Sequence, residues 1–250
     1  MSSYFENVPK IAYLFGDEND PVQFQNIANY SDLIDTYSDD ANAYIEMEIR
    51  DGERPDTLSH RLYDKSDYDW TFYLMNDRLR ETGWPMSMTQ IMERASTDFF
   101  QHYTCKIALT TADSAAQFSG LYQTGTEVLI GTKRGKVIRK NLDLAEIVVS
   151  SNDNVTGSVT LAYLTPDSSD PLQLGTSLTN TVYEYEGTHH YENDSEEQKD
   201  LFFDNMDGTA PVTNLQWLVN ENDKSKRIKI IKKNLVGQLS GELKRLLAAD

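Results

Sequence analysis

The stretch YIEMEIRDGERPDTLSHRLY, residues 44–63, changes from a strand pattern to a helix pattern at a single turn. Residues 44–50 alternate between apolar and charged side chains, with Ile45, Met47 and Ile49 on one side. This alternation predicts a half-buried strand. An Asp-Gly pair follows at once and predicts a tight turn.

Two short helices are predicted after this turn. Residues 55–63 begin with a proline and place leucines four residues apart, which favours a helix with one apolar face that ends near Tyr63. A second helix is expected to begin at Ser66 or Asp67 as its cap and to end at Asn76. The apolar face of the second helix is expected to contain Trp70, Tyr73 and Leu74.

A longer helix of about four turns is predicted from residue 87 to residue 103. Ser87 and Gln90 have the spacing of a capping box, while Gly83-Trp84-Pro85 is typical of a preceding turn. The apolar stripe of this helix is expected to contain Met88, Ile91, Met92, Ala95, Phe99 and Tyr103. Core packing is favoured over a ligand site for this stripe.

Residues 106–185 have the character of a β-rich insertion. Strands are predicted at 106–110, 127–130, 136–139, 146–149 and 158–164, separated by short turn-forming clusters, as in a small antiparallel sandwich or barrel. Residues 186–226 are predicted to be an irregular connecting segment that needs a partner to become ordered.

The end of the chain is predicted to form a strand at residues 227–233 and then a helix capped by Asn234. The inward positions of this helix are expected to be Val236, Leu239, Leu243 and Leu246. Gly237 and Gly241 would each weaken the helix by about 1 kcal/mol relative to alanine.

The formal net charge is −17, but residues 224–245 contain eight basic residues and one acid. The rest of the chain therefore carries −24, which disfavours general nucleic-acid binding. The single Cys105 cannot form an internal disulfide. Residues 1–15 lack a basic segment followed by an apolar run, so we expect a protein made and used in a cytoplasm.

The sequence contains no P-loop, no glycine-rich dinucleotide turn, no nucleophile elbow and no Cys-x-x-Cys pair. We therefore predict no enzymatic activity, no cofactor and no metal. His189 and His190 are adjacent and should face opposite sides of a strand, while His60 and His102 have no nearby ligand partner in sequence. Forty acidic residues leave a glycosidase carboxylate pair open, although abundance does not favour it.

Four segments together resemble the small wedge subunit that closes the baseplate ring in T-even-type contractile bacteriophages. They are residues 51–58, 62–64, 68–77 and 83–87: DGERPDTL, LYD, YDWTFYLMND and GWPMS. The opening segment YFENVPKIAY and the closing segment RIKIIK also look like the ends of that family. The motif and core positions of the resemblance are Gly52, Arg54, Pro55, Thr57, Leu58, Tyr63, Trp70, Leu74, Asn76, Trp84, Pro85, Ile228 and Ile230.

The same region is similar to a LysM module, a strand-helix-helix-strand unit best known from peptidoglycan-binding proteins. Such a module needs a second strand, and none follows Asn76 directly. We infer that residues 227–232 supply this strand and pair with residues 44–50. The basic closing strand would then lie beside Glu46 and Glu48, with a gain of about 0.2–1 kcal/mol for each charge pair.

The expected fold is α+β, with a LysM-like core, a long amphipathic helix, an inserted small antiparallel β domain and extended termini. Residues 1–43 would form an extended or helical N-terminal segment, and residues 44–105 the core with its long helix. The insertion at 106–185 and the connecting segment at 186–226 would then lead to residues 227–250, which complete the core.

The resemblance implies a structural protein of the virion tail, assembled in the host cytoplasm. It would join neighbouring baseplate wedges around the central hub, in about six copies or a small multiple per baseplate. Its partners would be the larger wedge scaffold proteins and the small sheath-proximal subunit, without nucleic acid or membrane. The candidate interface anchors are Tyr4, Phe5, Val8, Ile11, Tyr13 and Leu14. The alternative is a peptidoglycan-binding LysM module or a cell-wall hydrolase accessory.

Overall fold

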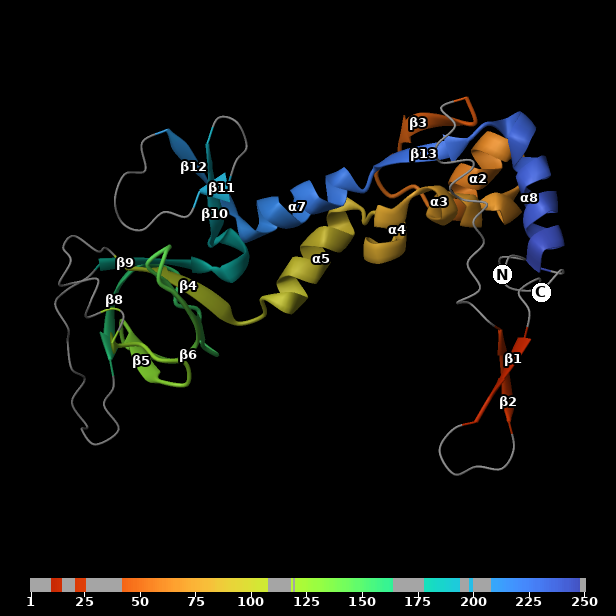
Figure 1. The fold of residues 1–250 in the computed structure, drawn as a ribbon. Helices are drawn as coiled ribbons and strands as arrows, with labels where there is room; N and C mark the ends of the chain where they lie inside the picture. Colours follow the sequence, from red (N-terminus) through yellow and green to blue (C-terminus); the bar gives the residue numbers. More distant parts are fainter. Residues whose placement is uncertain are drawn as a thin grey trace. The chain divides into compact units, whose positions relative to one another are not determined.

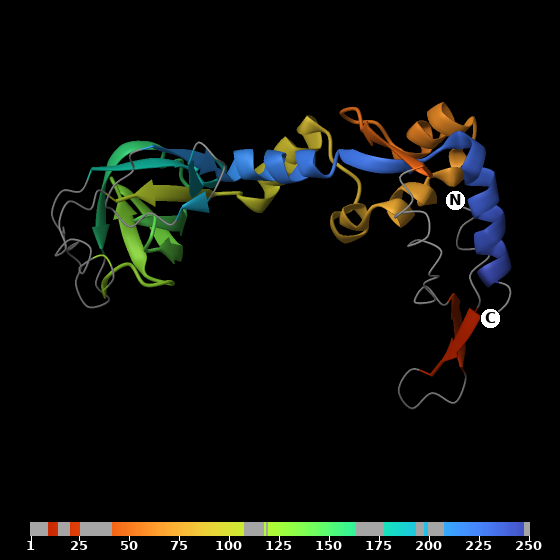
Figure 2. The ribbon, with the colours of Figure 1, turned by 45° about the horizontal axis from the view of Figure 1, so that its top comes forward.

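The chain has a mixed α+β fold that divides into two compact units. The computed structural model describes residues 10–14, 21–25, 42–107, 118, 120–163, 178–193, 198–199 and 208–247. The first unit contains residues 1–88 and 221–250, and the second contains residues 89–220. Figures 1 and 2 show the elements of each unit.

The first unit is built on two strands from opposite ends of the chain. Strand β3 (Tyr44–Glu48) pairs antiparallel with β13 (Arg227–Ile231), so that Glu46 lies opposite Lys229. Figure 1 shows the orange-red β3 beside the blue β13. The predicted pairing is confirmed, and a charge pair crosses it: Arg227 Nη2 lies 2.6 Å from Glu46 Oε2.

Short helices follow β3, and one long helix follows β13. They are α2 (Pro55–Tyr63), the 3-10 turn η2 (Ser66–Tyr68), α3 (Trp70–Met75), α4 (Asp77–Thr82) and α8 (Lys233–Leu247). The boundaries of α2 agree with the prediction. Asp69 caps α3 through its side chain, and Asn234 lies inside α8, so both predicted caps are wrong. Figure 2 shows α8 following directly from β13.

One apolar cluster holds these elements together. Its aromatic members include Tyr63 and Phe72, whose rings stack with centroids 6.1 Å apart. Ile45 departs from the predicted pattern, since it is 47% exposed while Ile49 is 3% exposed. The buried members of the cluster are Ile49, Leu58, Tyr63, Trp70, Phe72, Leu74, Met75, Leu79, Ile228, Ile230, Ile231, Val236 and Leu239.

Asn76 joins the helices to the sheet through its side-chain amide. Its Oδ1 accepts a hydrogen bond from the backbone N–H of Lys229, and its Nδ2 donates to the carbonyl of Lys229, both at 2.8 Å. The same Nδ2 donates to the carbonyl of Phe72 at 2.8 Å. One side chain therefore satisfies three backbone groups of two different elements.

The second unit contains a closed six-stranded antiparallel barrel. Its strands are β4 (His102–Lys106), β5 (Glu127–Ile130), β6 (Lys133–Asn141), β7 (Glu146–Ser150), β8 (Gly157–Tyr163) and β9 (Leu178–Tyr183). They follow one another in the order β4-β7-β6-β5-β8-β9, and β9 returns to β4. The ring of strands is visible in Figure 1. Of the two predicted architectures, the structure has the barrel, which leaves no open sheet edge.

Every strand except β9 contributes buried apolar side chains to the barrel interior, and β9 contributes the fully buried Thr181, whose hydroxyl donates to Cys105 Sγ at 3.5 Å. Tyr183 of β9 packs against the cluster as a partly buried residue. The buried members are Tyr103, Cys105, Ile107, Phe118, Tyr122, Val128, Ile130, Val137, Ile147, Val149, Val155 and Leu161.

The prediction of one helix from residue 87 to residue 103 is wrong at its end. Helix α5 spans Met88–Asp98, and Tyr103 lies in β4. Gln101 has a left-handed φ of 57°, which a continuing helix does not allow. The first barrel strand therefore begins at His102, and the predicted domain boundary at 105/106 falls inside β4. Met88 and Met92 are 47% and 44% exposed, so they do not belong to the core stripe.

The described part of residues 186–226 is regular, which corrects the predicted irregular segment. After the 3-10 turn η3 (Glu184–Glu186), strands β10 (Thr188–Asn193), β11 (Gln198–Lys199) and β12 (Thr209–Thr213) form a three-stranded sheet. Helix α7 (Asn214–Lys224) follows. Isolated polar strands give little apolar periodicity, so the sequence did not reveal this sheet.

Replacing Asn76 by alanine should lower the free energy of unfolding of the first unit by about 2–4 kcal/mol, because it leaves backbone groups of Lys229 and Phe72 without partners. Urea denaturation followed by tryptophan fluorescence would measure this. The exposed Asn234→Ala change should alter stability by less than about 0.5 kcal/mol. Equal effects of the two changes would contradict the assigned role of Asn76.

Gly237→Ala should stabilise the protein by about 0.5–1 kcal/mol, because Gly237 lies within α8 and an added Cβ meets no atom within 4 Å. Gly52→Ala should instead destabilise it by about 1–2 kcal/mol, because Gly52 has a φ of +69°. Melting temperatures of both variants, each compared with the unmodified chain, test the two opposite signs.

Candidate partner-binding surface

An exposed hairpin lies near the start of the chain. Strand β1 (Lys10–Tyr13) pairs antiparallel with β2 (Val22–Gln25), with Ile11 opposite Phe24 and Tyr13 opposite Val22. Directly opposed residues in an antiparallel pair project to the same side. These four side chains therefore form one apolar face, and Ala12 and Gln23 lie on the other face.

All four side chains of this face are substantially exposed. Their exposed fractions are 47% for Ile11, 45% for Phe24, 55% for Tyr13 and 43% for Val22. Leu14, which follows β1, is 57% exposed. We call Ile11, Tyr13, Val22 and Phe24 the hairpin face.

Three of the predicted interface anchors lie at or beside this face: Ile11, Tyr13 and Leu14. Tyr4, Phe5 and Val8 lie outside the described residues. Sequence reasoning missed Val22 and Phe24, although the alternation VQFQ at residues 22–25 is a strand signal that could have identified them. In the described part of residues 1–43, the segment expected to be extended or helical is extended and forms this hairpin.

The positions that carry the sequence resemblance lie mainly in the core and turns of the first unit. Leu58, Tyr63, Trp70, Leu74, Ile228 and Ile230 are buried. Gly52 occupies the turn after β3, Arg54 caps α2 through mutual hydrogen bonds with Thr57, and Pro55 begins that helix. Trp84 donates its indole N–H to the Glu53 carbonyl at 2.6 Å, and Pro85 is half-buried. Trp70 is 9% exposed and so presents no open ring for stacking on a sugar.

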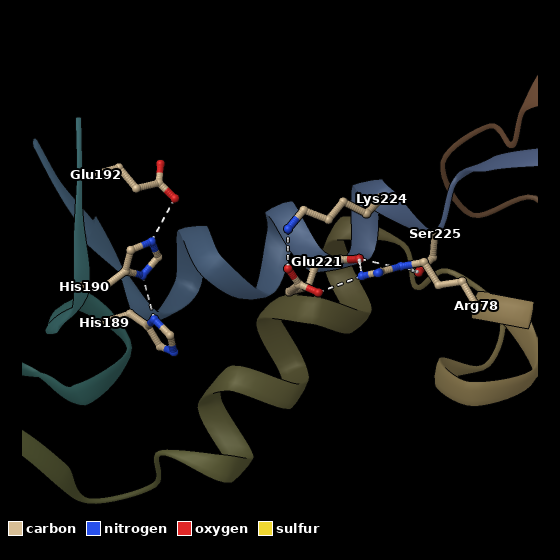
Figure 3. A network of polar contacts seen from close by, with 7 residues as sticks. All are labelled: Arg78, His189, His190, Glu192, Glu221, Lys224 and Ser225. Carbon is tan, nitrogen blue, oxygen red and sulfur yellow. Dashed lines mark hydrogen bonds and ion pairs between the residues drawn. The ribbon is translucent and has the colours of Figure 1, made fainter. Parts of the chain in front are cut away.

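The side chains of Arg78 and Glu221 form a polar link within the first unit. Arg78 Nη2 lies 2.6 Å from Glu221 Oε2, and its Nε donates to Ser225 Oγ at 2.9 Å. Lys224 also lies 2.6 Å from the Glu221 carboxylate, so this acid is shared by two cations. The network, shown in Figure 3, attaches α4 to the end of α7. Hydrogen bonds from Lys224 and, to a smaller extent, from Arg78 lower the pKa of the Glu221 carboxyl below its ordinary value.

The second unit contains a buried carboxylate held by two basic side chains. Glu184, with 4% of its side chain exposed, lies 2.9 Å from His102 Nδ1 and 2.8 Å from Arg139 Nη2. Asn214 Nδ2 donates to the Glu184 carbonyl at 2.5 Å. These bonds tie η3 to β4, β6 and the start of α7, and they account for a histidine that lacked a partner in the sequence.

His189 and His190 lie in contact, although the sequence predicted that they face opposite sides of a strand. Their Nδ1 atoms lie 2.7 Å apart, and His190 Nε2 lies 2.8 Å from Glu192 Oε1. Figure 3 shows the two rings turned toward each other. A register shift between Thr188 and His190 marks a bulge in β10, so the adjacent side chains need not face opposite sides. The His189 ring also stacks on Trp217, with centroids 4.5 Å apart.

Glu146 is the buried acid whose ionisation is most strongly altered. It is 5% exposed on β7, opposite Lys106 on β4. Burial raises the pKa of Glu146 to about 7, against the opposing effects of a hydrogen bond with Thr188 and the charges of Lys106 and Arg139. Lys106 donates to the hydroxyl of Tyr191 at 2.6 Å. The contacts of Glu146 with Thr188 and of Lys106 with Tyr191 link the barrel to β10.

Among the residues that the structure describes, no group of three or more histidine, cysteine or acidic side chains could hold a metal ion. Within the same residues, no helix is long and apolar enough to cross a membrane. Comparison with known proteins found no matching family model and no matching curated protein. With its four exposed apolar side chains on one side of a strand pair, the hairpin face is the candidate functional surface among the described residues.

The pKa of Glu146 predicts how the stability of the second unit depends on pH. The folded state binds its proton more tightly than the unfolded state, whose carboxyl has the ordinary pKa of 4.5. This contribution is complete below pH 4.5 and is lost as the pH rises through about 7. Between pH 5 and 8 the free energy of unfolding of the unmodified chain should fall by up to about 3 kcal/mol relative to that of the Glu146→Gln variant. Thermal denaturation across this range measures the difference, and the exposed Glu127→Gln control should follow the unmodified chain.

Proposed function

We propose that this chain is a structural component of a phage tail baseplate wedge, which joins neighbouring wedges around the central hub during assembly. The observation that carries the proposal is the hairpin face, an apolar surface on a strand pair near the start of the chain. Its first strand, β1, lies in residues 4–13, the segment that resembles the opening of the baseplate family and that contains the anchors Ile11 and Tyr13. The third described anchor, Leu14, follows directly.

The chemistry of the hairpin face suits burial against another protein. Two of its four side chains, Tyr13 and Phe24, are aromatic, and aromatic residues contribute a disproportionate share of interface energy. A two-stranded hairpin is marginally stable in water by itself and gains stability when one face is covered. A partner that covered this face would therefore both bind the hairpin and order it.

The pairing of β3 with β13 also supports the proposal. Strand β13 lies in the closing segment that resembles the baseplate family, and β3 directly precedes the resembling segment at residues 51–58. The two strands form one sheet although they lie far apart in the sequence. The pairing was inferred from that resemblance and from the LysM-like order of elements. The LysM-like core itself remains part of the proposal.

The proposal predicts the mass of the assembled complex. Co-expression of this chain with the other wedge proteins of its phage, followed by light scattering, should raise the mass from single wedges to a closed ring. The double change Ile11→Asp/Phe24→Asp places two charges on the hairpin face and should abolish this increase, because it buries unpaired carboxylates. The matched double change Ala12→Asp/Gln23→Asp adds the same residues to the opposite face and should preserve assembly.

A free monomer beside wedges that assemble unchanged would refute the role in assembly. The alternative of a peptidoglycan-binding module would then be favoured if the purified chain sediments with cell-wall sacculi. Clearing of the sacculi would instead indicate a hydrolase accessory. Loss of assembly in both double variants would show that the hairpin matters but that its apolar face does not.

A further inference from the structure

The two-stranded sheet of the first unit has two different outer edges. Backbone bonds at its ends define which residues pair: Ile49 N–H donates to the Lys226 carbonyl at 2.9 Å, and Lys232 N–H donates to the Ala43 carbonyl at 3.0 Å. Along an antiparallel strand, residues whose backbone groups bond the partner strand alternate with residues whose backbone groups point outward. The N–H and C=O groups of Tyr44, Glu46 and Glu48 therefore point away from β13.

The outer edge of β13 is closed by side chains. Asn76 bonds both backbone groups of Lys229 at 2.8 Å, and the Tyr63 hydroxyl donates to the Ile231 carbonyl at 3.0 Å. These are the positions opposite Glu46 and Tyr44. Two core residues thus occupy the edge at which a further strand would otherwise pair.

The outer edge of β3 is open. In the described structure, the outward backbone groups of Tyr44, Glu46 and Glu48 have no hydrogen-bond partner. The strand has no bulge in its register with β13, and it contains no proline. Its neighbouring side chains are accessible on both faces, since Ile45 is 47% exposed and the Glu46 side chain is 49% exposed. Such an edge is a template for an added strand.

The charges around the edge of β3 favour an added strand with basic side chains. Around the Glu48 end of this edge, Lys226 lies 2.8 Å from Asp223 and 3.7 Å from Asp51, and Arg227, which lies opposite Glu48, is ion-paired with Glu46. The pKa of Lys226 is raised first by the hydrogen bond with Asp223 and to a smaller extent by the charges of Asp51 and Glu48. The Glu48 carboxylate has no hydrogen bond or ion pair within the described residues. A basic side chain opposite Glu48 would therefore meet an acidic surplus.

A second copy of β3 does not suit this edge. When two such edges pair in the register of full overlap, Glu46 of each copy faces Glu46 of the other. Like charges directly opposite one another destabilise a strand pair. The existing partner strand shows the complementary chemistry, because Arg227 of β13 bonds Glu46 across the sheet.

We propose that the open edge of β3 binds an extended basic segment of a partner protein by strand addition. The segment alternates lysine or arginine, which face Glu46 and Glu48, with aliphatic residues, which cover Ile45 and Met47. Backbone bonds to residues 44, 46 and 48 supply affinity, and the alternating side chains supply selectivity. The site is separate from the hairpin face and does not depend on the assembly function proposed above.

The test uses the full-length chain and the labelled hexapeptide KVRVKV, followed by fluorescence anisotropy. This peptide should bind at least about fivefold more tightly than the scrambled KKRVVV, which has the same charge but cannot present two faces, and than EVEVEV. At saturation, amide hydrogen exchange of Tyr44, Glu46 and Glu48 should slow at least about tenfold.

Two matched variants separate this edge from general attraction to an acidic protein. Glu48→Lys should weaken KVRVKV binding about tenfold, because it replaces an attractive pair by a repulsive one. Glu81→Lys makes the same charge change on the exposed surface of α4 and should leave binding within about twofold. Far-UV circular dichroism checks folding, and Glu48→Gln, with a smaller loss, replaces Glu48→Lys if that variant fails to fold.

Equal binding of KVRVKV and KKRVVV would overturn the proposal, as would binding that leaves the three amides unprotected. Equal weakening by Glu48→Lys and Glu81→Lys would also overturn it, since it would indicate non-specific charge attraction. A dimer of the chain that protects the same amides without peptide would assign the edge to a second copy instead.

Discussion

The first unit depends on the pairing of β3 with β13, two strands that are distant in sequence. Leu58 and Phe72 belong to helices that precede the second unit in the chain, whereas Ile228, Ile230 and Ile231 follow it. The pairing of β3 with β13 brings these three isoleucines into the same apolar cluster. The entropic cost of closing so long a connection rises only with the logarithm of its length. A complete folded unit can therefore stand between two strands of one sheet.

Satisfaction of polar groups explains much of the remaining architecture. Asn76 and Tyr63 close one edge of the sheet, and Glu184 is buried only together with His102 and Arg139. Glu146 differs from Glu184, because the hydrogen bond with Thr188 and the charges of Lys106 and Arg139 do not fully offset the effect of its burial. Its pKa therefore rises. A buried carboxyl group that lacks sufficient charged or hydrogen-bonding partners favours its neutral form.

Two surfaces of the first unit are suited to binding other proteins, by different physical means. The hairpin face offers exposed apolar area, whose burial is non-directional and needs shape complementarity. The edge of β3 offers aligned backbone donors and acceptors for an extended partner, and the side chains of Glu46 and Glu48 favour a basic one. The proposed assembly role uses the hairpin face, and the proposed strand addition uses the edge of β3.

Local patterns determined the elements, and tertiary contacts determined how several of them are used. The alternation of residues 44–50 and the basic alternation near residue 228 predicted two strands, and the resemblance to a LysM module predicted their pairing. Local residue patterns also predicted α2 and most barrel strands. Residue patterns did not show that Ile45 stays exposed or that α5 stops at Asp98, because burial and strand pairing depend on residues far along the chain. The bulge that brings His189 to His190 and the side chains that close one sheet edge but leave the other open were likewise decided by the tertiary structure. A sequence pattern records which faces are apolar, but which backbone groups find partners depends on the packed fold.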